Sequence, residues 1–151
     1  MFCKFKESRI WFTKSYKIIM INILLNGYSG NMGTALSNYI QNSNNFKILY
    51  GIDRQNSHLF NTIRKKPDVI IDFSTPSSTF IALNYAIENL IPVVIATTGF
   101  SKKQESKISE YSEAIPIFKS SNMSYGITLL SNIIAQLAQK FENADIEILE
   151  K

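Results

Sequence analysis

Three glycines at one fixed spacing mark the first stretch of this chain that could do chemistry: Gly27, Gly30 and Gly33, in GYSGNMG. Glycine costs backbone entropy inside regular structure, so this spacing indicates a tight turn that lets another group approach the backbone. The stretch lies between an apolar run and a helical pattern, so the positive end of a helix points over the turn. This arrangement favours an anion such as a pyrophosphate, although glycine-rich turns also occur simply to close a strand–helix corner.

An acid and a base follow each other at Asp53 and Arg54, where the second apolar run ends. Asp53 lies about 20 residues beyond Gly33, the separation at which a carboxylate accepts hydrogen bonds from an adenosine ribose. The guanidinium of Arg54 has the shape and charge to bind a ribose 2′-phosphate. Both residues also occur in ordinary turns, and that interpretation stays open.

Small polar residues follow the later apolar runs, in DFSTP, ATTGF and SSNMSYG. They leave room for a flat ring and a ribose, which their hydroxyls and backbone groups can orient. Asp72, in the first of these motifs, is interpreted as a structural cap of the turn rather than as a catalytic carboxylate. The single histidine, His58, is interpreted as a solvated loop residue. No residue is predicted to be catalytic or to bind a metal.

The elements that must position these residues alternate along the chain. Proline at a first-turn position indicates a helix that starts at Thr75–Pro76, and Ser101 and Gln104 match a capping box. An alternation of strands and helices predicts an α/β fold, a doubly wound parallel sheet of Rossmann type, whose ligands bind at the carboxyl ends of the strands. The strands are predicted at 20–26, 46–53, 68–74, 91–98 and 115–118, and the helices at 31–43, 75–90 with an inward stripe of Phe80, Leu83, Ile87 and Leu90, and 101–113.

Composition and charge exclude several classes of protein. The chain has 151 residues, 45% of them hydrophobic, which fits one globular domain of ordinary size. Its net charge of +4 resides in residues 1–19, so the remainder presents no basic excess for nucleic acid. Residues 1–19 also lack the apolar core of a secretory signal, and no run approaches the roughly 18 apolar residues of a membrane span. Residues 1–19 are therefore expected to be a disordered tail or an upstream extension of the reading frame, and the lone Cys3 favours a reducing, cytoplasmic location.

Five motifs, in this order, resemble the 4-hydroxy-tetrahydrodipicolinate reductase (dihydrodipicolinate reductase) family of diaminopimelate and lysine biosynthesis: GYSGNMG, DFSTP, ATTGF, SSNMSYG and DIEILE. The resemblance runs from about Ile21 to Glu150 and implies NADH or NADPH as the cofactor. It implies that Asp53 and Arg54 take the adenosine ribose or its phosphate. It further implies a pyrophosphate site at Gly27, Tyr28, Ser29, Gly30, Asn31 and Met32, and a nicotinamide side lined by Ala96, Thr97, Thr98, Ser120, Ser121, Asn122 and Met123.

The family pattern continues where this sequence does not. In the family, the strand that resembles DIEILE leads into a second domain through a block H-H-x-x-K-x-D-x-P-S-G-T-A, whose histidine donates a proton and whose lysine assists. The sequence here stops at Glu150–Lys151. The expectation is a dinucleotide-binding domain at 20–123 and, at 124–151, a connecting helix and first strand of a substrate domain that is absent. Two functions stay open: the cofactor-binding part of the reductase, inactive alone, or a stand-alone dinucleotide-binding module or inactive gene remnant.

The residues near the end of the sequence predict how the chain assembles. Because the family resemblance implies a tetramer built through the second domain, this chain is not expected to form that tetramer. An apolar helix face and an apolar strand would then lack partners, which predicts self-association that removal of residues 144–151 reduces. The helix face comprises Ile127, Leu130, Ile134, Leu137 and Phe141, and the strand comprises Ile146, Ile148 and Leu149.

Overall fold

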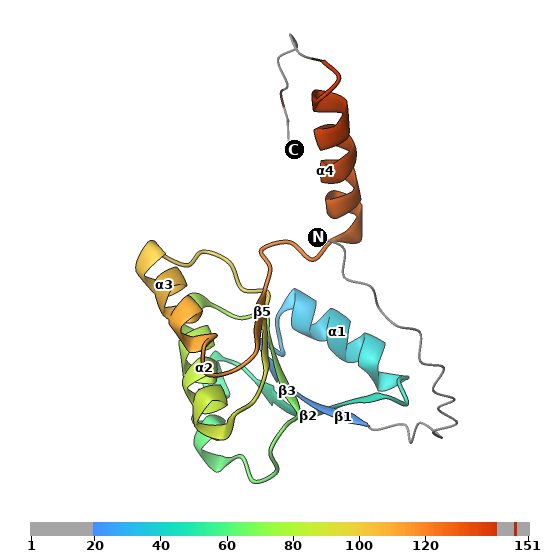
Figure 1. Cartoon of the computed structure of the whole chain (residues 1–151). Coiled ribbons are helices and arrows are strands. Elements are labelled where there is room, and N and C mark those ends of the chain that lie inside the picture. The colour runs from blue at the N-terminus through green and yellow to red at the C-terminus, as the bar shows by residue number, and fades with distance from the viewer. Residues whose placement is uncertain (1–19, 142–146, 148–151) are drawn as a thin grey trace, which may run out of the picture.

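A computed structural model of the chain describes residues 20–141 and Glu147. The tail expected at residues 1–19 and most of the strand expected around Ile146 lie outside the described residues. The described part is a five-stranded sheet with helices on both faces and a fourth α-helix, α4, that extends away from the sheet (Figure 1). No helix in residues 20–141 combines the length and hydropathy needed to cross a bilayer.

All four strand pairs are parallel and the sheet order is β2-β1-β3-β4-β5, which confirms the predicted fold class. The first strand is therefore an interior strand, with the second on one side of it and the third on the other. This reversal of strand order is the place where α/β sheets bind ligands. In chain order the elements are β1 (Ile21–Asn26), α1 (Asn31–Gln41), β2 (Phe46–Ile52), the 3₁₀ segment η1 (Arg54–Thr62), β3 (Val69–Asp72), α2 (Pro76–Asn89), β4 (Val93–Ile95), α3 (Lys102–Tyr111), β5 (Ile117–Lys119) and α4 (Tyr125–Ala138).

Two apolar clusters hold the layers together, one on each face of the sheet. Ile23 and Leu25 of β1 pack with Ile40 of α1 on one face. Leu24, between them, points to the opposite face and joins the larger cluster beneath η1, α2 and α3. Successive side chains of a strand point to opposite faces, so a nearly continuous apolar run is what a strand covered on both sides requires.

A bulge in β2 changes which residues reach each face. Ile23 pairs with Ile48 and the next residue, Leu24, pairs with Tyr50, so Leu49 is an extra residue. Ile48 consequently packs with the α1 cluster, whereas Tyr50, two residues later, packs with the cluster on the other face. A regular strand would have put both on one face, and the apolar run FKILYGI carries no sign of the bulge.

The second helix differs from the predicted stripe at its end. Leu83 is buried as expected, and Phe80 and Ile87 are half-buried against the larger cluster. Leu90, however, is 70% exposed and has φ 51° at the helix C-cap, so its assignment to the inward stripe is wrong. The chain turns there, and Ile91, directly before Pro92, fills the buried position instead.

Other boundaries moved by a few residues. The fourth strand was predicted at 91–98 and spans only Val93–Ile95, and the fifth was predicted at 115–118 and spans Ile117–Lys119. The segment between β2 and β3, where His58 was interpreted as a loop residue, forms the 3₁₀ segment η1.

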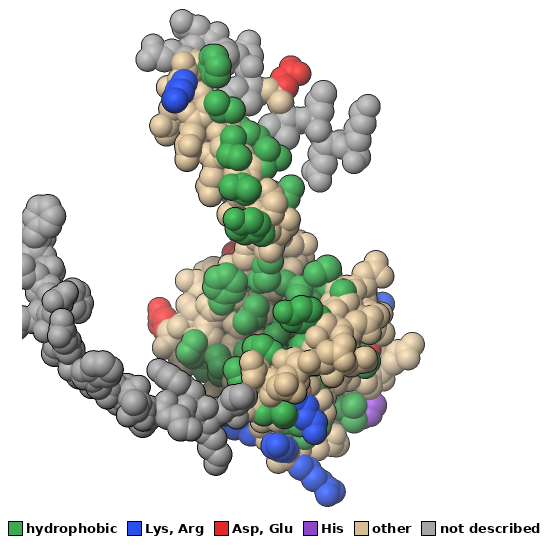
Figure 2. Space-filling view, turned by 90° about the vertical axis from the view of Figure 1, so that its right-hand side faces the viewer, with side chains coloured by type: hydrophobic (Ala, Val, Ile, Leu, Met, Phe, Trp, Pro, Cys, Tyr) green, Lys and Arg blue, Asp and Glu red, His purple; other side chains and the backbone are tan. Residues whose placement is uncertain are grey.

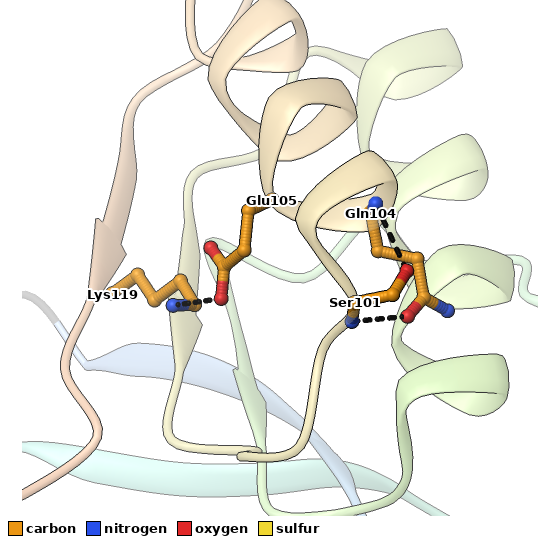
Figure 3. Close-up of polar contacts among 4 residues, drawn as sticks. All are labelled: Ser101, Gln104, Glu105 and Lys119. Atoms are coloured by element: carbon orange, nitrogen blue, oxygen red, sulfur yellow. Dashed lines mark hydrogen bonds and ion pairs between the residues drawn. The ribbon is translucent and has the colours of Figure 1, made fainter.

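The third helix begins at the predicted capping box (Figure 3). Ser101 N–H donates to Gln104 Oε1 (2.8 Å), and Gln104 N–H donates to Ser101 Oγ (3.4 Å). An ion pair of 2.9 Å between Glu105 and Lys119 ties this helix to β5. The helix is thereby fixed beside the edge strand that leads to the 120–124 segment.

Candidate dinucleotide-binding site

Backbone hydrogen bonds connect the carboxyl ends of the five strands into one rim. Each bond runs from the residue just after one strand to the end of its neighbour, so the loops that follow the strands are held at fixed spacing. The bonds are Gly27 N–H to Ile52 O (2.7 Å), Phe73 N–H to Asn26 O (2.9 Å), Ala96 N–H to Asp72 O (2.9 Å) and Ser120 N–H to Ile95 O (3.1 Å).

The three glycines of the loop after β1 meet different surroundings. Gly27 has φ 86°, and a Cβ there would lie 2.4 Å from Phe73 O. A Cβ on Gly33 would lie 2.1 Å from Gly27 O, because α1 packs directly on the loop. At Gly30 the nearest atom would be 3.3 Å away, so that position is comparatively open. Gly27 makes the turn and Gly33 allows the helix to approach it.

The amino end of α1 presents backbone donors beside this loop. The first bond of the helix runs from Thr34 N–H to Gly30 O (2.8 Å), so the N–H groups of Asn31, Met32 and Gly33 have no acceptor within the helix. Among the described residues no side chain caps this end, and the first turn contains no acidic residue. Together with the helix dipole, these donors suit an anion.

Asp53 contacts the same loop from the end of β2. Ser29 N–H donates to both carboxylate oxygens of Asp53, at 3.0 and 3.2 Å. The amide of Asn56 fixes the strand end on both sides of Ile52, because its Oδ1 accepts from Asp53 N–H (2.6 Å) and its Nδ2 donates to Gly51 O (3.2 Å). Arg54 follows as the exposed first residue of η1. Sequence reasoning missed Asn56, although its spacing of three from Asp53 is that of a helix N-cap and its N3 residue.

A cavity of about 350 Å³ lies on the other side of the loop. It brings together six predicted site residues from three separate segments, and it adds Phe73 and Ser124, which were not predicted. Its lining comprises Met32, Phe73, Ala96, Ser120, Ser121, Asn122, Met123 and Ser124. The 120–124 segment is ordered by its own side chains, since Ser120 Oγ donates to Asn122 O (2.6 Å) and Ser124 N–H donates to Asn122 Oδ1 (2.8 Å).

Two predicted residues point away from this cavity. The Tyr28 ring lies over Gly51 and lines a different hollow of about 510 Å³ between α1 and β2. Thr97 is 5% exposed, and its hydroxyl donates inward to Asp72 Oδ2 (2.8 Å). The neighbouring Thr98 is exposed, as are Ser29, Gly30 and Asn31 on the loop.

Asp72 and His58, the other titratable residues considered in the sequence, do not line the cavity. Asp72 is fully buried and bonded to side chains around the turn, as its structural interpretation requires. His58 is exposed on η1 and is not among the residues that line the cavity. Within the described residues no three His, Cys, Asp or Glu side chains are grouped so that they could hold a metal ion.

The sequence of this chain is similar to those of known proteins. Residues 21–123 match a family model described as dihydrodipicolinate reductase, N-terminus. The chain is 41% identical over 141 residues to the 4-hydroxy-tetrahydrodipicolinate reductase of Clostridium novyi, covering 87% of this chain and 56% of that protein. It is 39% identical over 133 residues to the protein of the same name from Campylobacter jejuni serotype O:6, covering 87% and 53%. The chain thus spans little more than half the length of these relatives.

A solved structure shares the fold. The dipicolinate-bound dihydrodipicolinate reductase from Paenisporosarcina sp. TG-14 superposes with a TM-score of 0.64 at 22% identity, covering 80% of this chain and 54% of that one.

Proposed function

The chain belongs to the dihydrodipicolinate reductase family, and from that premise we propose that it binds NADH or NADPH as the cofactor-binding part of a 4-hydroxy-tetrahydrodipicolinate reductase. Residues 20–123 form the dinucleotide-binding domain in this proposal, and 124–151 connect it to a substrate domain. The bound cofactor supplies a hydride from its nicotinamide ring to an unsaturated cyclic substrate. An enzyme of this biosynthetic pathway is expected in the cytoplasm.

One observation carries the proposal: the glycine loop is flanked by a carboxylate on one side and a cavity on the other. Ser29 of the loop bonds to Asp53, and Met32, three residues further along in the first turn of α1, lines the cavity of about 350 Å³. An extended dinucleotide needs its charged centre on the loop and its two ends on opposite sides of it. The contact of Ser29 with Asp53 and the position of Met32 at the cavity are consistent with this arrangement of the ligand.

Each part of the site has a distinct task under this proposal. The N–H groups of Asn31 and Met32 bind the pyrophosphate, and Asp53 accepts from the adenosine ribose. The small side chains and backbone groups of the 120–123 segment, with Ala96 and Thr98, orient the nicotinamide end. Thr97 contributes through its backbone, since its hydroxyl is already bonded to Asp72.

Arg54 provides the test of how the two cofactors are accommodated. If its guanidinium binds the 2′-phosphate, Arg54→Ala weakens NADPH binding by about 1 to 3 kcal/mol, the scale of a hydrogen bond to a charged group. NADH binding changes little, because NADH lacks that phosphate. Isothermal titration calorimetry of both cofactors measures the difference, and Arg64→Ala, an exposed arginine beyond η1, is the matched control. Equal weakening of NADH and NADPH by Arg54→Ala excludes the role.

A polypeptide of these 151 residues is proposed to bind the cofactor without turnover. Its one histidine does not line the cavity, and the sequence contains no H-H-x-x-K block. We expect no oxidation of NADH when the purified chain is mixed with 4-hydroxy-tetrahydrodipicolinate. Measurable oxidation contradicts this expectation, and failure to bind either cofactor favours an inactive gene remnant. An in-frame or frameshifted H-H-x-x-K block in the DNA beyond Lys151 would instead favour a complete reductase over a stand-alone dinucleotide-binding module.

A further inference from the structure

A fully buried carboxylate lies beneath the rim of the proposed cofactor site. Asp72 is the last residue of β3 and has no exposed surface. Four side-chain donors converge on its two oxygens. They are Asn26 Nδ2 (2.7 Å) and Ser74 Oγ (2.5 Å) on Oδ1, and Thr79 Oγ1 (2.5 Å) and Thr97 Oγ1 (2.8 Å) on Oδ2.

Two of the four donors come from the segments that carry the two halves of the proposed site. Asn26 ends β1 and directly precedes the glycine loop, whereas Thr97 follows β4 between Ala96 and Thr98. Ser74 N–H donates to Thr97 Oγ1 (2.9 Å), so the Thr97 hydroxyl is fixed by both a donor and an acceptor. Asp72 is the group to which both segments are bonded.

We propose that Asp72 is a positioning residue that sets the glycine loop in register with the nicotinamide side of the site. This inference rests on the proposed function, because it takes the rim as a dinucleotide site. Backbone hydrogen bonds connect the two loops only indirectly, through the end of β3, since the loops belong to β1 and β4, which are not neighbours in the sheet. The Asp72 carboxylate reaches both through side chains in the space between them.

An amide cannot replace this carboxylate. Asparagine at position 72 has the same shape but only one acceptor oxygen, and its NH₂ group would face hydroxyls or an amide that now donate. Buried donors without an acceptor are costly, so the four donor side chains must rearrange to find new partners. The expected result is altered spacing between the loops rather than loss of one contact with the ligand.

The experiment compares a whole dinucleotide with one of its halves. Asp72→Asn should weaken NADH binding about tenfold or more, while ADP, which needs only the loop and Asp53, should change by less than about twofold. Asp68→Asn is the matched control, because Asp68 directly precedes β3 at its opposite end and also accepts hydrogen bonds, from Asn22. This control should leave both affinities unchanged. Circular dichroism establishes that each variant is folded, and calorimetry gives the dissociation constants.

The outcomes separate this inference from the proposed function. Wild-type affinity of folded Asp72→Asn for NADH overturns the positioning role, and so does an equal loss for NADH and ADP. If Asp72→Asn does not fold, Thr97→Val removes only the Thr97 hydroxyl, with its bonds to Asp72 and from Ser74 N–H, and must show the same selective loss for NADH. A Thr97→Val variant with an unchanged ratio of NADH to ADP affinity overturns the role. Failure of the unaltered chain to bind either nucleotide overturns the proposed function and this inference with it.

Discussion

At the scale of single residues, the three equally spaced glycines of the loop differ in how strictly the structure requires glycine. We expect Gly27→Ala and Gly33→Ala each to lower the free energy of unfolding by at least about 2 kcal/mol, from left-handed backbone strain at the first and a backbone clash at the second. Gly30→Ala should cost less than about 1 kcal/mol, because its φ of −71° suits alanine and its nearest contact is only slightly tight. Chemical denaturation of the three variants measures the differences. A loss at Gly30 as large as that at Gly33 would contradict this assignment.

Asp68 makes the stability of the domain depend on pH. The backbone N–H of Asn22, followed by its side-chain amide, holds the pKa of Asp68 below its usual value. A folded pKa below the unfolded value contributes stability that is present above about pH 4 and is lost as the pH falls through the folded pKa.

The variant Asp68→Asn should therefore melt below the wild type at pH 7, and the difference should shrink on acidification towards about pH 3. Thermal unfolding followed by circular dichroism at a series of pH values measures this convergence. Glu113→Gln is the control, because it also removes one negative charge, at an exposed position just after α3. A gap between wild type and Asp68→Asn that does not change with pH would show that the carboxylate charge is not involved.

Sequence reasoning placed some site residues well and others only approximately. The separation between Gly33 and Asp53 predicted a carboxylate near the loop, and Asp53 indeed bonds to Ser29. Thr97 and Thr98 looked equivalent as neighbours in a polar motif, yet one is buried and the other exposed. Which of two adjacent residues faces inward depends on where β4 ends, and the acceptor that holds Thr97 comes from another strand. Whether any of these residues binds a cofactor stays a prediction.

At the scale of elements, the contact between Gly51 of β2 and Tyr28 of the glycine loop joins the edge strand of the sheet to that loop. A Cβ on Gly51 would lie 2.5 Å from Cγ of Tyr28, so Gly51→Ala must displace the tyrosine ring. We expect a loss of about 1 to 3 kcal/mol in stability. In a Tyr28→Ala background the ring is removed and only a tight 3.0 Å contact with the Cβ of residue 28 remains, so the same change should cost less than about 1 kcal/mol.

A double-mutant cycle of these two positions, followed by urea denaturation, measures their coupling. The coupling should have a magnitude of about 1 kcal/mol or more. Additive effects of Tyr28→Ala and Gly51→Ala would show that the ring does not occupy the space above Gly51.

The element order was predictable, and the reasons are local. Apolar runs of strand length, Pro76 at a helix start and the Ser101–Gln104 capping box each specify a short segment without reference to the rest of the chain. The errors arose where tertiary packing decides. Leu90 has helical spacing from Leu83, but α2 ends before Leu90. The chain turns at Leu90, and Ile91 packs in the core instead. The extra residue Leu49 is set by the pairing of β1 with β2, which no single strand encodes.

At the scale of the whole molecule, α4 is the least covered element. Figure 2 shows apolar side chains along this helix, and none of its residues is buried. Leu130 and Leu137, two turns apart on one face, are 51% and 49% exposed. Exposed apolar surface of this extent favours association, so the isolated 151-residue chain should self-associate as its concentration rises.

Replacement of Leu130 and Leu137 by glutamate should reduce this association and leave NADH affinity unchanged, because neither residue lines the proposed site. Light scattering coupled to size-exclusion chromatography measures the mass over a range of concentrations. Gln136→Glu introduces one negative charge on the same helix without removal of an apolar side chain, and serves as the control. A monodisperse monomer of the unaltered chain at high concentration would contradict the prediction.

The hydrogen bonds of Asp72 can form only in a fixed order during synthesis, because its partners are far apart along the chain. Asn26 is made 46 residues before Asp72, and Thr97 follows 25 residues after that. At about 5 to 20 residues per second, roughly 2 to 9 s separate the first two residues alone. During this interval β1 has no β3 beside it, and the glycine loop lacks its neighbour Phe73. A nucleotide therefore meets a finished site only after the 120–124 segment that follows β5 has been translated, so it can stabilise the completed domain but cannot guide the first strands into place.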